Sequence, residues 1–97
     1  MTDRAHPALP ASVELGSDVI WQKVDGQVVL LALNPGRYYA LDTVGSRIWE
    51  VLLEDSDVAH AQERLLMMFD VDDPTLRRDL AELIARLVGA DLLEVTA

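Results

Sequence analysis

The stretch Asn34-Pro-Gly-Arg-Tyr-Tyr-Ala-Leu-Asp-Thr-Val-Gly-Ser-Arg-Ile-Trp49 places a turn, a short strand and the start of a helix in direct succession. Proline and glycine hold the second and third positions of a four-residue turn. This predicts a type II turn, because proline presets φ and glycine accepts a positive φ. Two adjacent tyrosines favour a strand over Arg37–Leu41, and Asp42 or Thr43 can cap the following helix. Strand and helix are therefore predicted to share one joint.

Two further strands are predicted before this joint. Asp18–Val24 and Gln27–Leu33 are rich in β-branched and aliphatic residues, and Asp25-Gly26 separates them. This dipeptide is typical of two-residue hairpin turns. Together with Arg37–Leu41 the two segments predict a three-stranded antiparallel meander. Its middle strand is apolar at nearly every position, and its last strand forms an edge.

Three helices are predicted after the strands. Apolar residues at helical spacing and polar residues that can cap a helix place them at about residues 42–53, 56–69 and 73–89. For the third helix, Asp73 is the expected cap, Pro74 the first helical residue and Gly89 the end. The apolar tail Leu92–Val95 adds a strand or closes over the core. Three strands followed by three helices predict an α+β fold of winged-helix type.

Composition limits the classes of function. Ninety-seven residues, 51% of them hydrophobic, are enough for one domain, and we expect residues 18–97 to form it. Residues 1–17 are predicted to be a flexible arm in which residues 13–15 can order against the body. The net charge of −9 opposes nucleic-acid binding and favours a cationic partner, or serves solubility alone. The chain has no cysteine, which excludes disulfides and thiolate chemistry. With no apolar run of membrane-spanning length and no signal segment, a cytoplasmic location is expected.

The joint resembles the PqqD family, the small RiPP recognition elements that bind leader peptides in the biosynthesis of ribosomally made, modified peptides. The residues that carry the resemblance are Tyr38-Tyr39-Ala-Leu41-Asp42, then Gly45, then Ile48-Trp49. It extends from about Val19 to Leu93. Asp42 departs from the family, which often has asparagine there, although both residues cap helices.

The resemblance implies a non-enzymatic domain that presents a precursor peptide to separate processing enzymes. In lasso peptide biosynthesis these enzymes are a leader peptidase and a cyclase, and we prefer this pathway. In pyrroloquinoline quinone assembly the partner is a radical S-adenosylmethionine enzyme. No cofactor, metal or membrane is expected. A DNA-binding winged helix and a structural dimerisation module are the competing classes.

No arrangement of residues in the chain predicts catalysis. His6 lies in the arm and His60 on an expected exposed helix face, and neither has a second ligand or a nucleophile at useful spacing. Asp72-Asp73 is read as a helix cap rather than a cation site. Trp21 and Trp49 could form a ligand platform but are more typical of a core or its rim.

The DNA-binding alternative would use the third helix for recognition and its arginines, Arg77, Arg78 and Arg86, for phosphate contacts. Asp79 and Glu82 interleave with these arginines as expected i,i+3 or i,i+4 partners, which leaves no excess basic patch. The charge pattern therefore argues against DNA.

The edge strand is the more informative feature, because its unpaired backbone groups can receive an extended peptide as a further strand. The resemblance implies that the leader runs antiparallel to this strand, beside the third helix. Helical geometry gives that helix a leucine stripe with an apolar flank, and we expect the flank to face the groove, with Leu80 at the floor. The alternative is that Ile84 and Val88 only finish the core. The predicted peptide-binding residues are Arg37, Tyr38, Tyr39, Ala40, Leu41, Arg77, Leu80, Ala81, Ile84 and Val88.

Overall fold

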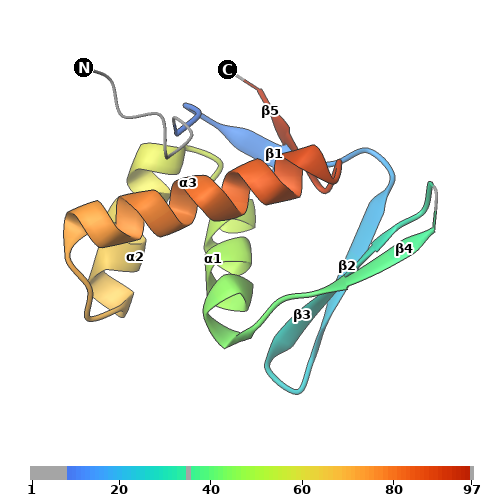
Figure 1. Ribbon diagram of the computed structural model, residues 1–97, viewed down its shortest axis with the longest axis horizontal. Coiled ribbons are helices and arrows are strands. Elements are labelled where there is room, and N and C mark those ends of the chain that lie inside the picture. Colours follow the sequence, from blue (N-terminus) through green and yellow to red (C-terminus); the bar gives the residue numbers. More distant parts are fainter. Residues whose placement is uncertain (1–8, 35, 97) are drawn as a thin grey trace.

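A computed structural model describes residues 9–34 and 36–96 of the chain. The elements follow one another as β1 (Val13–Leu15), β2 (Val19–Val24), β3 (Gln27–Ala32), β4 (Arg37–Ala40), α1 (Thr43–Glu54), α2 (Val58–Met68), α3 (Asp73–Gly89) and β5 (Leu93–Val95). The helices gather on one side of the molecule and β2–β4 on the other, with α3 lying across α1 (Figure 1). The predicted α+β fold, a three-stranded meander followed by three helices, is confirmed.

The meander has the order β2-β3-β4, and both pairings are antiparallel. Its first turn is the predicted Asp25-Gly26 pair, and both residues have a positive φ, 51° and 82°. This conformation matches the right-handed twist of the two flanking strands, so the dipeptide sets the register that places Trp21 opposite Leu30.

The second turn connects β3 to β4. Gly36 has a φ of 90°, as its place in the predicted turn requires, and its nitrogen donates to the Ala32 carbonyl at 2.8 Å. Pro35, the other residue on which the type II prediction depends, lies outside the described residues. The positive φ explains why glycine stands at this position.

Side-chain caps start the first two helices. Asp42 accepts from the Gly45 nitrogen at 2.7 Å, and Asp57 accepts from the His60 nitrogen at 3.1 Å. The predicted N-cap of α3, Asp73, was wrong by one residue. Asp72 is its N-cap, without a side-chain hydrogen bond, while Asp73 accepts from Gln62 at 2.5 Å. Asp73 is the first residue of α3, and its side chain is used in this contact with the neighbouring helix α2.

The core lies between the inner face of the meander and the helices. Trp49 is fully buried, as are Leu30 of β3 and Leu80 of α3. Trp21 meets Trp49 edge to face, with ring centroids 6.1 Å apart. The two tryptophans therefore pack as core and rim, and they do not form an open ligand platform.

A second, two-stranded sheet joins the two ends of the described chain. β1 pairs antiparallel with β5, with Val13 opposite Val95 and Leu15 opposite Leu93. Val13 is fully buried, so this part of the expected arm is ordered against the body, as the sequence analysis allowed. Residues 1–8 of the arm lie outside the described residues. In Figure 1 this sheet runs along the C-terminal half of α3.

The helices are short relative to a bilayer. Among the described residues, none is both long and apolar enough to cross a membrane.

Candidate functional site

The candidate site is the outer edge of β4. Within the described residues β4 pairs with β3 alone, so its other side carries backbone groups without a strand partner. The strand is exposed at three of its four residues, and Tyr38 is 76% exposed. An edge of this kind can accept an additional strand.

The register shows which backbone groups point outward. The Leu41 nitrogen donates to the Val28 carbonyl at 2.9 Å, and Ala40 stands opposite Val29. Backbone groups alternate in direction along an antiparallel strand. Tyr39 therefore shares the inward direction of Leu41, whereas the N–H and C=O groups of Tyr38 and Ala40 face outward.

A buried serine of α1 holds the end of this edge in place. The Ser46 hydroxyl accepts from the Val28 nitrogen at 2.7 Å and donates to the Leu41 carbonyl at 3.3 Å. It thereby replaces a direct backbone hydrogen bond between β3 and β4 at the point where their ladder ends. The first turn of α1 and the last residues of the strand are thus one rigid unit.

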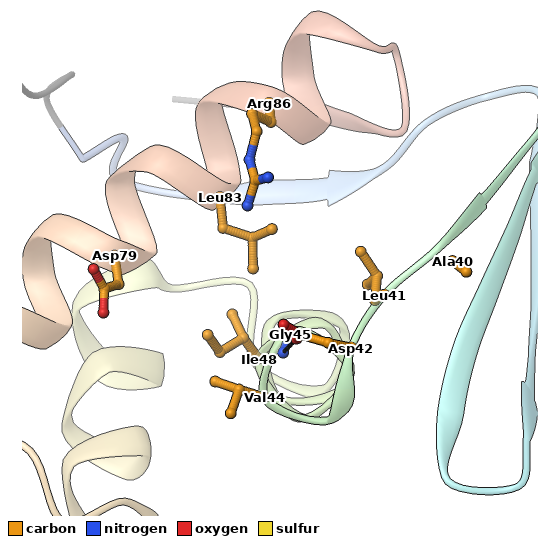
Figure 2. A pocket seen from close by; sticks show the side chains of 9 residues that line it. All are labelled: Ala40, Leu41, Asp42, Val44, Gly45, Ile48, Asp79, Leu83 and Arg86. Carbon is orange, nitrogen blue, oxygen red and sulfur yellow. Dashed lines mark hydrogen bonds between the residues drawn. The ribbon is translucent and has the colours of Figure 1, made fainter.

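Between β4 and α3 lies a groove made of two adjoining pockets of about 400 and 450 Å³. Both are bordered by Ala40 and Leu41 on the strand and by Leu83 and Arg86 on the helix. The first pocket continues past the N-terminus of α1, with Val44 and Ile48 as its wall. The second continues along Tyr38 and Tyr39 to Leu92. In Figure 2, Leu83 and Arg86 point from α3 into the space bordered by Leu41 and by the start of α1.

The helix face that borders the groove differs from the predicted one. The groove is lined by Asp79, Leu83, Arg86 and Leu87, which include the flank expected to face solvent. On the other side of α3, a separate hollow of about 410 Å³ is bordered by the residues Leu9, Pro10, Ala81, Ile84, Ala85, Val88, Gly89 and Val95.

The predicted helix residues therefore do not come together with the strand. Leu80, Ala81 and Ile84 are buried in the body of the protein, and Val88 is half-buried on the far side. Arg77 is exposed and borders neither groove pocket. Ile84 is part of the core, as the alternative prediction stated. The physical reason is that β5, which pairs with β1, packs against α3, and its Val95 lies beside that apolar flank together with Leu9 and Pro10.

Several groove residues were missed by the sequence analysis. The first turn of α1 supplies Asp42, Val44 and Gly45, and the end of α3 supplies Leu87 and Ala90. The α1 residues had a signal in the sequence, because a helix that starts directly after an edge strand must lie against the end of any groove beside it. The α3 residues had no such signal in the sequence, since their pattern is equally consistent with a flank that faces solvent.

The charged groups of the groove are unevenly placed. Asp42 and Asp79 border the first pocket, whereas Arg86 borders both. Arg78 Nε lies 3.7 Å from Asp79 Oδ1. Arg86 has no ion pair within the part of the chain that the structure describes. His60 contacts Asp55 on the α2 side of the molecule, and His6 is outside the described residues. The groove thus offers apolar walls, the outward backbone groups of β4, two aspartates at the first pocket and one arginine shared by both pockets.

Comparisons with known proteins identify one family and two solved structures that are similar to this chain. The family described as coenzyme PQQ synthesis protein D (PqqD) matches residues 27–93. A solved structure of TbiB1 in complex with the TbiA(beta) leader peptide is 37% identical, with a TM-score of 0.80 over 87% of this chain and 98% of that chain. A lasso peptide synthetase B1 complexed with the leader peptide shares the fold, with 24% identity and a TM-score of 0.78 over 87% and 99%. No curated protein matches the chain.

Proposed function

This chain belongs to the PqqD family, and we propose that it is a non-catalytic recognition protein for the leader of a ribosomally synthesised, modified precursor peptide. The observation that carries the proposal is the free edge of β4 beside an apolar groove. TbiB1, the relative with 37% identity, was solved with a leader peptide bound. Family, fold and edge therefore favour the same class of ligand.

The proposed binding mode is strand addition. An extended leader lies antiparallel to β4 and exchanges hydrogen bonds with the outward N–H and C=O groups of Tyr38 and Ala40. Alternate side chains of the leader enter the two pockets, where Leu41 and Leu83 form the floor. Backbone contacts supply affinity in any sequence, whereas the pockets select side chains.

The domain acts by proximity. A leader held on β4 raises the local concentration of the precursor beside a processing enzyme, which requires no catalytic group here. We prefer a lasso peptide leader peptidase and cyclase as these enzymes. TbiB1, with 37% identity, was solved with a leader peptide, and the lasso peptide synthetase B1 that shares the fold was also solved with the leader peptide. A cytoplasmic location is part of the same proposal.

A second candidate is a carrier of the precursor for a radical S-adenosylmethionine enzyme in pyrroloquinoline quinone synthesis. The description of the matching family favours it. The two candidates differ in the peptide bound, so the genes beside this one separate them. A short lasso precursor gene and a peptidase gene would support the first pathway.

Fluorescence polarisation tests the proposed function with three labelled probes: the TbiA(beta) leader, the leader encoded beside this gene, and a duplex DNA. We expect saturable binding of at least one leader and weaker binding of its scrambled version, which keeps the backbone contacts but loses the pocket contacts. DNA should not bind at physiological salt, given the net charge of −9. Salt-sensitive DNA binding without leader binding would overturn the proposal and support the DNA-binding winged helix instead.

A further inference from the structure

Arg86 is placed where a bound peptide would cover it. It borders both groove pockets, together with Leu83 of α3, Ala40 of β4 and the following residue Leu41. Figure 2 shows its side chain extending from α3 into the space between α3, Leu41 and the first turn of α1. The helix has two other arginines, and neither borders the groove. Arg78 instead lies beside Asp79.

We propose that Arg86 selects an acidic residue, aspartate or glutamate, in the leader segment that occupies the groove. This inference rests on the proposed function and deepens it by naming a side chain of the peptide. A guanidinium offers several donors in a fixed plane and binds a carboxylate through two parallel hydrogen bonds. Within the described residues Arg86 has no carboxylate partner of its own, so the leader would supply it.

The protein's charge makes such a selection specific. A net charge of −9 repels acidic peptides as a whole, so an acidic residue is favoured only where a local cation meets it. Asp42 and Asp79 border the first pocket and disfavour a carboxylate there. The second pocket has Arg86 as its charged residue. The acidic side chain is therefore expected on the side of Arg86 that faces the second pocket, away from Asp42 and Asp79.

Strand geometry gives the position of this residue in the peptide. Side chains on one side of an extended chain recur about every 6.7 Å, so residues two apart can fill adjoining pockets. The second pocket lies beside Tyr38 and Tyr39, at the start of β4. A leader antiparallel to β4 reaches this end last. The expected pattern is two apolar residues two positions apart, with one acidic residue within two positions on their C-terminal side.

A displayed library of random 15-residue peptides, sorted against the folded protein, tests this pattern. Wild type should enrich the apolar pair with an acidic residue after it, and Arg86→Glu should enrich lysine or arginine at that same position. Arg77→Glu is the matched control, since it makes the same charge change on the same helix at an exposed position that borders neither groove pocket. Its enriched pattern should equal that of the wild type.

The outcomes separate the two proposals. If wild type and Arg86→Glu enrich the same residues at the acidic position, Arg86 makes no selection, while strand addition stands. Enrichment of the acidic residue before the apolar pair would likewise refute the assigned position. If wild type enriches no peptide and binds no leader, both proposals fail together.

Affinity measurements add a second readout. For the enriched peptide, Arg86→Gln should weaken binding about three- to tenfold, the range for a charge pair at the rim of a covered surface. Replacing the peptide's acidic residue by its amide should cost the same factor, and the two changes together should cost no more than either alone. Independent, multiplying losses would show that the two groups do not meet.

Discussion

The Ser46 hydroxyl lies 2.7 Å from the Val28 backbone nitrogen, so a helix side chain closes the end of the β3–β4 ladder. The same oxygen donates to the Leu41 carbonyl at 3.3 Å. Ser46 and Val28 are both fully buried. Buried backbone groups need a partner, so this serine lets the sheet end against α1 without an orphaned donor.

Ser46→Ala should lower the free energy of unfolding by about 1–3 kcal/mol, because it leaves the buried Val28 N–H without an acceptor. Ser12→Ala is the matched control. Its hydroxyl also makes a hydrogen bond, to Thr96 at 2.6 Å, but at an exposed site where water can replace it. Denaturant unfolding of both variants measures the difference. Equal decreases in the free energy of unfolding for the two variants would show that the buried Ser46 hydrogen bonds stabilise the fold no more than an exposed one.

Ala40→Pro should abolish leader binding while the protein stays folded. The Ala40 N–H faces outward, so proline removes a donor to the leader and places its ring in the path of an added strand. Tyr39→Pro should instead destabilise the fold, by about 1–3 kcal/mol, because its inward N–H belongs to the pairing with β3.

Thermal unfolding and fluorescence polarisation of the two proline variants provide the comparison. A folded Ala40→Pro variant that binds leader with wild-type affinity would exclude β4 as the docking edge. The other free edge of the meander, β2, would then be the next place to test.

Val44→Asp should weaken leader binding by about tenfold or more, because it places a charge in the wall of the first pocket that the leader covers. Val44 is 52% exposed in the first turn of α1, where an acidic residue suits the helix dipole, so stability should hold. Ala85→Asp is the control on the other flank of α3. Loss of binding by Ala85→Asp alone would restore the originally predicted helix face.

Gly16→Ala should destabilise the protein by about 1–3 kcal/mol, because a Cβ at this position would overlap the Asp91 carbonyl oxygen and press on Val19. The close approach exists because the Gly16 nitrogen donates to the Leu92 carbonyl at 3.0 Å. Gly89→Ala is the comparison, since open space surrounds a Cβ there. It should be neutral, or stabilising by about 0.5–1 kcal/mol. Calorimetric melting temperatures that rank the two the other way would refute this packing argument.

Local chemistry explains why much of the fold could be read from the sequence. Asp25-Gly26 favours one hairpin conformation, and Asp42 and Asp57 cap the helices that they precede. These preferences act between residues at most a few positions apart, so they hold before the chain is folded. The boundary of α3 was less predictable, because Asp73 hydrogen bonds to Gln62 of another helix.

The strand half of the candidate site was predictable for the same reason, and the helix half was not. β4 is the last strand of a meander, which makes it an edge in any packing of the helices. The leucine stripe of α3 shows that the helix has a buried face, but apolar and charged residues flank the stripe on both sides. The same helical periodicity is satisfied by Ile84 and Val88 on one flank and by Leu87 on the other.

By itself, the sequence determined the order of the three meander strands and the three helices, the Asp25-Gly26 turn, the exposed edge and the resemblance to a peptide-binding family, because each depends on neighbouring residues. The tertiary structure alone decided which flank of α3 meets that edge. Strand β5, which pairs with β1 at the other end of the described chain, packs against α3 on the Ile84 flank, and Leu83 and Arg86 are left beside β4. A pairing between residues more than seventy positions apart leaves no periodic trace in either segment.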